Sequence, residues 1–323
     1  MLAEGCPKTF RGNMASLRDR TWRSGPLPEI PDLEVYISAL CPRILGQELI
    51  GARLGNPFLL RTVDPPLDEV VGRQVIAIER MGKRLVLTLD GDLFLVVHLM
   101  IAGRLHWKAS GDPIPRGSGL AVFDFPTGTL VLTEAGKKRR ASLHLVRGRE
   151  ALGALDPGGV EVMAAGFETF CAALAGDNRT LKRALTDPHV LAGIGNAYSD
   201  EILHRARLSP FKLTGALTEE EWHRLYDASR SVLLEWTAKL HTEAGSSFPD
   251  KVTAFRPEMA VHGRFGQPCP VCGARVQRIV YAENECNYCP GCQTEGRILA
   301  DRALSRLLKD DWPRTLQDLE ARE

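Results

Sequence analysis

The sequence lacks any long hydrophobic run. No stretch approaches the roughly eighteen uninterrupted apolar residues that a membrane-spanning helix requires, and the N-terminal region lacks the apolar core of a signal peptide. We therefore expect a cytoplasmic protein without a membrane partner. In that reducing compartment the eight cysteines should be thiols or metal ligands rather than disulfides.

The chain also lacks a strong net charge, because 41 Lys and Arg residues stand against 40 Asp and Glu residues. This balance hides local clusters. Residues 137–140 form an unbroken basic run, and Arg179, Lys182 and Arg183 form a second basic group. Such groups attract phosphates, although a charge run can equally be a solvated surface.

The first half of the chain carries a β pattern behind one helix. Residues 1–27 show no periodicity, and we interpret them as a disordered extension or a wrongly assigned start. Apolar residues then recur at helical spacing from Leu33 to Ile44. Short β-rich segments separated by glycine turns follow, so residues 28–150 are predicted to form a domain built on an antiparallel sandwich or barrel.

The second half of the chain changes character. Residues 151–166 are rich in Gly, Asp, Pro and Ala and are typical of a linker, whereas residues 167–256 carry helix formers with turn breaks. Residues 257–293 are dense in Cys, Gly and Pro. They are too few to form a stable hydrophobic core without an additional link such as a bound metal or a disulfide. Residues 294–323 mix leucines with charges and indicate a helical tail. At 323 residues, several domains are expected.

The cysteines of the third segment form two C-x-x-C pairs. Cys269 and Cys272 are separated by sixteen residues from Cys289 and Cys292, which is typical of a four-cysteine zinc site on a β-hairpin. A redox dithiol would leave the second pair unexplained. We predict one structural Zn²⁺, which would contribute on the order of 10 kcal/mol to folding of this segment. Cys286 is expected to be a bystander.

The pair Pro28-Glu29 raises a chemical question. A proline nitrogen within a chain is an amide, whereas a proline at a free N-terminus is a secondary amine that can attack a sugar carbon. In the written sequence 27 residues precede Pro28. Whether the protein is an enzyme therefore depends on where its polypeptide begins.

Taken together, Pro28-Glu29, the β-rich domain, the GIGNAY motif at residues 193–198 and the cysteine pairs resemble the formamidopyrimidine-DNA glycosylase and endonuclease VIII family. The resemblance runs from about Leu27 to Gln293. It implies a multidomain α+β fold: an N-terminal antiparallel β-sandwich with flanking helices, a helical helix-two-turn-helix domain and a C-terminal four-cysteine zinc finger. It also implies a monomeric DNA glycosylase and abasic-site lyase that removes oxidised bases from double-stranded damaged DNA.

The resemblance assigns catalytic roles to three residues. Pro28 would attack C1′ of the damaged nucleotide and form a Schiff base that decays by β- and δ-elimination. Glu29 would protonate the deoxyribose ring oxygen. Lys83 would hold a phosphate and assist elimination. The positive end of the following helix disfavours an ammonium at Pro28, which helps to keep the attacking amine neutral.

The resemblance also indicates DNA contacts. Ile101 would fill the gap left by the everted base as an apolar wedge. Lys182, Asn196 and Arg264 are candidate phosphate ligands. Arg139 or Arg140 would replace the arginine that pairs with the orphaned base; these two complete the predicted DNA-binding residues.

Three features depart from the family pattern. Residues 134–141 contain no aromatic residue where the family has a wedging phenylalanine, so the preferred opposite base stays open. Asn284 stands where the family often has an arginine, and its neutral hydrogen bond to phosphate is weaker, which favours Arg278 instead. Leu27 occupies the position of the initiator methionine. Since leucine codons can start bacterial translation, our hypothesis is that synthesis begins at codon 27 and that methionine removal exposes Pro28.

Two other functions fit the same residues. A non-catalytic member would recognise damaged or branched DNA without cutting it, and this case is expected if residues 1–27 are retained. A zinc-dependent transcription or RNA-binding factor would show no preference for lesion-containing duplex. The sequence leaves open whether oxidised purines or oxidised pyrimidines are preferred, and whether elimination is β only or both β and δ.

Overall fold

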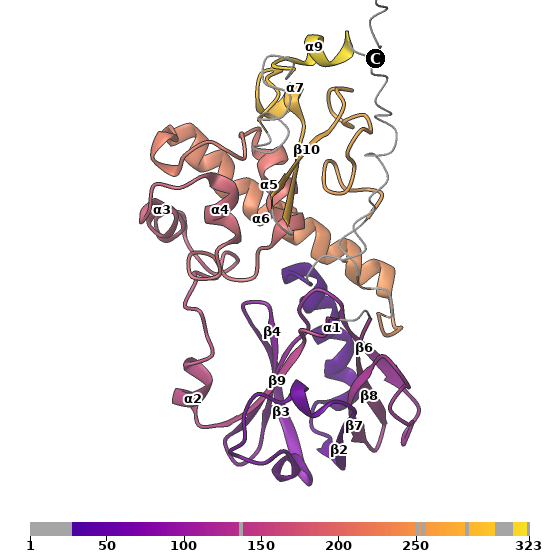
Figure 1. Cartoon of the computed structure of the whole chain (residues 1–323). Coiled ribbons are helices and arrows are strands. Elements are labelled where there is room, and N and C mark those ends of the chain that lie inside the picture. Colours follow the sequence, from indigo (N-terminus) through magenta and orange to yellow (C-terminus); the bar gives the residue numbers. More distant parts are fainter. Residues whose placement is uncertain are drawn as a thin grey trace, which may run out of the picture.

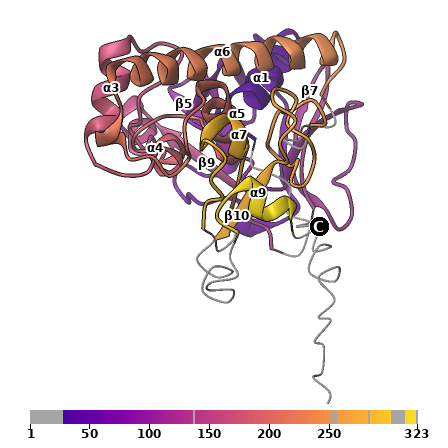
Figure 2. The same cartoon turned by 90° about the horizontal axis from the view of Figure 1, so that it is seen from above.

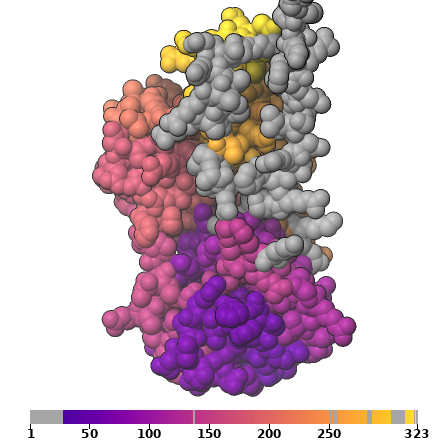
Figure 3. All heavy atoms as spheres, in the orientation of Figure 1, coloured from indigo at the N-terminus to yellow at the C-terminus, as the bar shows by residue number. Residues whose placement is uncertain are grey.

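The computed structural model describes residues 28–135, 138–249, 252, 256–281, 284–300 and 313–321. A β-rich domain at the bottom of Figure 1 carries a helical domain and a cysteine-rich module above it. The same two levels form a lower and an upper lobe in the space-filling view (Figure 3). No helix within these ranges has the length and apolar character needed to cross a bilayer. The expectation for residues 1–27 lies outside the described residues.

Two antiparallel sheets form the β-rich domain. The first sheet has the order β1 (Glu48–Leu49), β3 (Arg73–Met81), β4 (Arg84–Leu89), β5 (Leu93–His98) and β9 (Ser142–Arg147). The second has the order β2 (Gly51–Leu54), β7 (Gly119–Phe125), β8 (Gly128–Glu134) and β6 (Gly103–Lys108). Leu87 and Leu95 of the first sheet share one buried core with Phe123 and Leu132 of the second. The predicted antiparallel β-sandwich is thereby confirmed.

Strand β5 of the first sheet is buried on both faces. Alternate residues of a strand point to opposite faces, so Phe94 and Val96 of β5 face away from the sandwich core. They form a second small cluster with Val146, and α2 (Arg149–Gly153) covers it through Leu152. Because both faces of β5 are buried, its sequence is a nearly continuous run of apolar residues.

Helix α1 (Ile30–Ile44) packs against the sandwich. Leu33, Tyr36, Leu40 and Ile44 recur every three or four residues, and all four side chains are fully buried. Glu29 is the N-cap: its backbone N–H donates to Oδ2 of Asp32 at 3.0 Å. Short 3₁₀ turns follow the first strands at η2 (Pro57–Leu59) and η3 (Leu67–Val70).

The helical domain contains α3 (Phe167–Ala175), α4 (Leu181–Thr186), α5 (Asn196–Ala206), the 3₁₀ turn η4 (Thr214–Ala216) and α6 (Glu219–Ala244). Its core includes Phe170, Leu185, Ile202 and Leu225. Ile30, the first residue of α1, belongs to this core rather than to that of the sandwich. Helix α6 lies along both α5 and α1, as Figure 2 shows, and so packs against both domains.

The cysteine-rich module is built on the predicted β-hairpin, formed by β10 (Gln277–Tyr281) and β11 (Asn284–Tyr288). A short helix α7 (Pro290–Gln293) begins directly after Cys289, its N-cap, and carries Cys292. Val261 and Val276 form a small buried cluster with the cysteines. Of the tail, the structure describes α9 (Leu316–Glu320), while residues 301–312 lie outside the described ranges.

Candidate active site and metal centre

The Glu29 carboxylate lies at the N-terminus of α5. It is fully buried and accepts hydrogen bonds from the backbone N–H groups of Gly195 at 2.6 Å, Ala197 at 2.8 Å and Tyr198 at 3.3 Å. The first N–H groups of a helix have no partner within the helix and carry partial positive charge. A carboxylate accepts hydrogen bonds from these N–H groups, and its negative charge compensates their partial positive charge. The β-sandwich domain thus supplies the cap of a helix in the other domain.

Two glycines make this approach possible. A Cβ on Gly195 would lie 2.6 Å from the carboxyl carbon of Glu29, and a Cβ on Gly193 would lie 2.3 Å from the side chain of Ile30. Gly193 also has φ +81°, a conformation that favours glycine. The two glycines of the GIG motif thus admit the start of α1.

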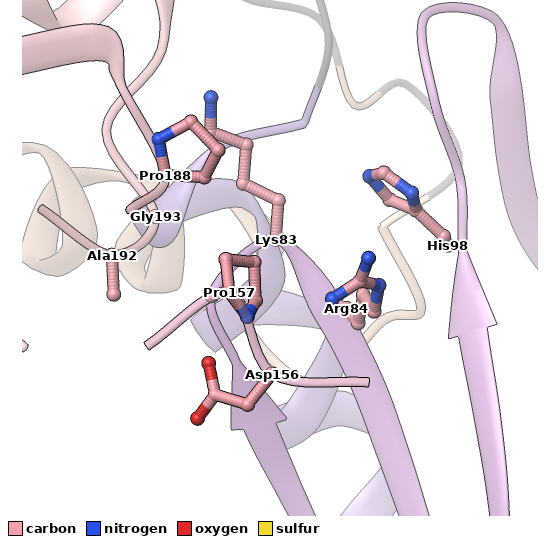
Figure 4. Close-up of a pocket in the computed structure, with 9 residues that line it drawn as sticks. Lys83, Arg84, His98, Asp156, Pro157, Pro188, Ala192 and Gly193 are labelled. Atoms are coloured by element: carbon pink, nitrogen blue, oxygen red, sulfur yellow. The ribbon is translucent and has the colours of Figure 1, made fainter. Parts of the chain in front are cut away.

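Lys83 lies in the turn between β3 and β4 and lines a pocket between the domains. The side chain extends from the sandwich toward the turn that carries Pro188 and Gly193 (Figure 4). Burial lowers the pKa of Lys83, Lys182 lowers it further, and Glu29 opposes both effects. Pro28 is buried and directly precedes Glu29. Of the predicted catalytic residues, Pro28 is thus the chain neighbour of Glu29, and Lys83 is close enough to feel the charge of Glu29.

Two further nitrogen-bearing side chains line the same pocket beside Lys83. Arg84 and His98 belong to its wall, and Figure 4 shows His98 on the neighbouring strand. Burial, together with the charges of Arg84 and Lys83, lowers the pKa of His98 to about 4. Its buried Nε2 has no hydrogen-bond partner within the described residues. The cations in this wall, Lys83 and Arg84, suit an anionic ligand, whereas His98 is neutral near pH 7 and adds no charge.

The predicted DNA contacts of the sandwich lie on two loops. Ile101 is half-buried in the turn between β5 and β6. Arg139 is exposed and donates to the carbonyl of Gly117. The backbone N–H of Arg140 donates at 2.9 Å to the buried carboxylate of Glu134, which thereby fixes the basic loop. Sequence reasoning missed Glu134, and Lys137 lies outside the described residues.

Lys182 requires a correction. The Lys182 side chain is 2% exposed, and its ammonium donates to Oδ1 of Asp200 at 2.5 Å, the Asn196 carbonyl at 2.7 Å and Oγ of Ser199 at 2.8 Å. A direct phosphate contact does not fit this burial, because an ammonium has three donors and all three have acceptors here. Lys182 instead fixes the first turn of α5, on which the half-buried Asn196 lies.

The middle of α5 holds the cysteine-rich module. The Glu201 carboxylate accepts from the backbone N–H groups of residues 260–262 at 2.8–2.9 Å. Oδ2 of Asp200 lies 2.8 Å from Nδ1 of His262 and accepts from the backbone N–H of Asn287 at 3.1 Å. Sequence reasoning missed these contacts of the acidic pair. Two adjacent acids on a buried helix are a signal that could have found such partners.

Arg264 supports the loop before the first cysteine pair. Its guanidinium donates to Oε1 of Gln267 at 3.1 Å and to the carbonyls of Met259 at 3.0 Å and Pro268 at 3.3 Å. The side chain is half-exposed. These contacts orient the guanidinium, and the predicted phosphate contact remains a prediction.

The four predicted cysteine ligands converge. Sγ of Cys269 lies 3.8 Å from Sγ of Cys292, and Sγ of Cys272 lies 3.3 Å from Sγ of Cys289. A tetrahedral zinc with bonds of about 2.3 Å places its sulfurs about 3.8 Å apart, so the donors fit a structural metal. His204 of α5 also joins the cluster, with Nε2 at 3.3 Å from Sγ of Cys269. No spacing rule connects His204 with these cysteines, and sequence reasoning missed it.

The comparisons with known proteins agree with this geometry. The sequence models of the formamidopyrimidine-DNA glycosylase N-terminal domain and H2TH domain match residues 27–142 and 156–246. A formamidopyrimidine-DNA glycosylase of Thermus thermophilus is 36% identical over 84% of this chain and all of its own length.

Two crystal structures of the Lactococcus lactis protein, called Fpg, are also similar. The complex with abasic-site DNA has a TM-score of 0.72 and 26% identity, covering 82% of this chain and 99% of that protein. The complex with DNA containing an oxidised pyrimidine has a TM-score of 0.73 and 27% identity, covering 83% and 100%. From its sequence, its two matched domains and its fold, the chain belongs to the formamidopyrimidine-DNA glycosylase family.

Proposed function

We propose that this protein is a bifunctional DNA glycosylase and abasic-site lyase that removes oxidised bases from duplex DNA. The observation that carries this proposal is the buried Glu29 carboxylate, which lies beside Pro28 at the contact between the two domains. The names of the relatives support it, since the Thermus protein is a named glycosylase and the Lactococcus structures hold abasic and oxidised DNA.

In the first step the nitrogen of Pro28, as a free secondary amine, attacks C1′ of the damaged nucleotide. The bond from C1′ to the base breaks as the bond from C1′ to nitrogen forms, and the base leaves as an anion that takes a proton from water. The new ammonium then gives its proton to Glu29, which delivers it to the ring oxygen. The ring opens and leaves an iminium ion between Pro28 and the sugar.

Lys83 is the residue that we assign to the elimination step. The iminium acidifies the C2′ proton, and removing that proton expels the 3′ phosphate. A buried amine is protonated less readily than one in water, and burial lowers the pKa of Lys83. Its place in the pocket between the domains suits both a proton transfer and contact with a phosphate.

The cysteine-rich module has a structural role in this proposal. Cys269, Cys272, Cys289 and Cys292 would hold Zn²⁺ and so fix the hairpin that faces α5. Four thiolates leave no open coordination position, so we assign this site no chemical step. Arg264 and the loop with Arg139 and Arg140 would contact the DNA backbone or the orphaned base.

The proposal requires that the nitrogen of Pro28 be unacylated. If residues 1–27 are retained, this nitrogen is an amide, and the rival function is damaged-DNA recognition without cutting. A chain that begins with methionine directly before Pro28, from which the methionine is removed, should cut duplexes containing 8-oxoguanine or thymine glycol. The 323-residue chain, with its intact mass verified, should bind them uncut. Equal cutting by both proteins would overturn the mechanism.

A further inference from the structure

The four thiols of the metal centre differ in exposure. Cys269 and Cys289 are buried and Cys292 is half-buried, whereas Cys272 is exposed. An exposed thiolate ligand meets water and competing solutes that the buried ones do not. Of the four predicted cysteine ligands, Cys272 is therefore the one that most readily dissociates from the metal.

His204 lies on the buried side of the same centre. It is 7% exposed and lies on the last turn of α5, one turn after Asp200 and Glu201. Both acids are tied to the module by the hydrogen bonds described above, so α5 holds the imidazole in place. One ring nitrogen of His204 and the sulfurs of Cys269, Cys289 and Cys292 all lie within 4.8 Å of one another. This donor set omits the exposed Cys272.

We propose that His204 is a reserve zinc ligand that replaces Cys272. Three thiolates and one imidazole are a common donor set for structural zinc. With bonds of about 2.3 Å to sulfur and about 2.0 Å to nitrogen, such a tetrahedron separates nitrogen from sulfur by roughly 3.5 Å. The distance of 3.3 Å between Nε2 of His204 and Sγ of Cys269 is close to that value. The other separations in this set are at most 4.8 Å and would shorten when the four donors bind one ion.

The simpler alternative is that His204 only donates an N–H to the Cys269 thiolate. Such contacts orient metal ligands without binding the metal. In that case the centre has one complete donor set, and loss of any thiolate, exposed or buried, leaves three ligands. The two roles predict different zinc contents when Cys272 is removed.

The test measures zinc per chain in the full-length protein after equilibration with a competing chelator. Cys272→Ala should keep about one zinc, the matched control Cys289→Ala should lose it, and His204→Phe alone should keep it through four thiolates. The double variant His204→Phe/Cys272→Ala should lose the metal. Loss of zinc from Cys272→Ala, whether or not that variant folds, overturns the proposal, as does retention in the double variant.

A spectroscopic readout identifies the ligand directly. The protein is loaded with ¹¹³Cd²⁺, whose chemical shift distinguishes four sulfur ligands from three sulfurs and one nitrogen. The wild-type signal should be that of four sulfurs, and the Cys272→Ala signal should move toward that of three sulfurs and one nitrogen. A signal for three sulfurs and water in Cys272→Ala contradicts a role for His204 as ligand.

Discussion

The Glu29 carboxylate accepts the backbone N–H of Gly195 at 2.6 Å, across 166 residues of sequence. This contact joins the start of the β-sandwich domain to the first turn of α5. The same helix binds the cysteine-rich module through Asp200 and Glu201. Helix α5 therefore positions the proposed proton-transfer group and the proposed zinc finger relative to each other.

Replacing Glu29 by Gln should slow excision while leaving the protein folded. The amide keeps the shape but turns an NH₂ group toward backbone N–H donors, which should lower the free energy of unfolding by about 1–3 kcal/mol. Loss of the proton-transfer group should slow single-turnover excision by about 10²–10⁴-fold. Glu150→Gln, at an exposed position of α2, is the control. A Glu29→Gln enzyme with wild-type excision would show that another group carries the proton.

Replacing Gly195 by Ala should displace Glu29. The new Cβ would lie 2.6 Å from the carboxyl carbon, so either α1 or α5 must shift. Overpacking of this kind costs about 1–3 kcal/mol. A displacement of the reacting groups by about 1 Å should reduce excision about 100-fold. Gly153→Ala is the matched control, since no atom lies within 4 Å of its added Cβ. Equal rates in both variants contradict the positioning role of Gly195.

Asp32 should make stability depend on pH. Burial raises the pKa of Asp32 from 3.8 to about 6, while its hydrogen bond from the Glu29 N–H and the charge of Arg256 oppose the rise. Between these pH values the folded state holds a proton that the unfolded state has lost, so stability falls as pH rises through this window. Ionising Asp32 on the folded protein then costs about 3 kcal/mol.

Asp32→Asn removes this titration. The free energy of unfolding of the variant, relative to the natural protein, should increase between pH 4 and pH 8 by up to about 3 kcal/mol. Urea unfolding at the two pH values measures the change. A difference that is the same at both pH values shows that Asp32 does not titrate in this range.

The variant Lys182→Met tests whether Lys182 supports α5 or contacts DNA. Removing the ammonium leaves the Asp200 carboxylate without its 2.5 Å partner, which should cost about 3–5 kcal/mol. A buried lysine makes no phosphate contact, so the slope of log Kd against log salt should stay unchanged. Lys138→Met, at an exposed position of the basic loop, should reduce that slope by about 1 if Lys138 contacts phosphate. A reduced slope in Lys182→Met would restore Lys182 as a DNA ligand.

Local patterns explain how much of the fold could be predicted from sequence. The spacing of the two C-x-x-C pairs is typical of a four-cysteine zinc site on a β-hairpin, and the cysteines converge as predicted. The strands of the sandwich are bounded by glycine turns, and α1 shows its buried face in Leu33, Tyr36 and Leu40. Each of these signals is contained in a short window of sequence.

Contacts between distant segments could not be predicted in the same way. A lysine within a basic group such as Arg179, Lys182 and Arg183 is expected at the surface. Lys182 is nevertheless buried, because its partner Asp200, eighteen residues later in the sequence, lies on the adjacent helix. His204 and Cys269 are 65 residues apart, and only the packing of α5 against the module brings them together. The family resemblance gave Glu29 a role, but its hydrogen bonds to the start of α5 are visible only in the structure.

The most direct measurement locates the covalent bond. The chain that starts at Pro28 is incubated with duplex DNA containing 8-oxoguanine, borohydride is added to reduce the iminium, and the cross-linked peptide is sequenced by mass spectrometry. Our account predicts a sugar remnant on the nitrogen of Pro28, and no cross-link when an extra residue precedes it. A remnant on Lys83, or on any other side chain, contradicts the account.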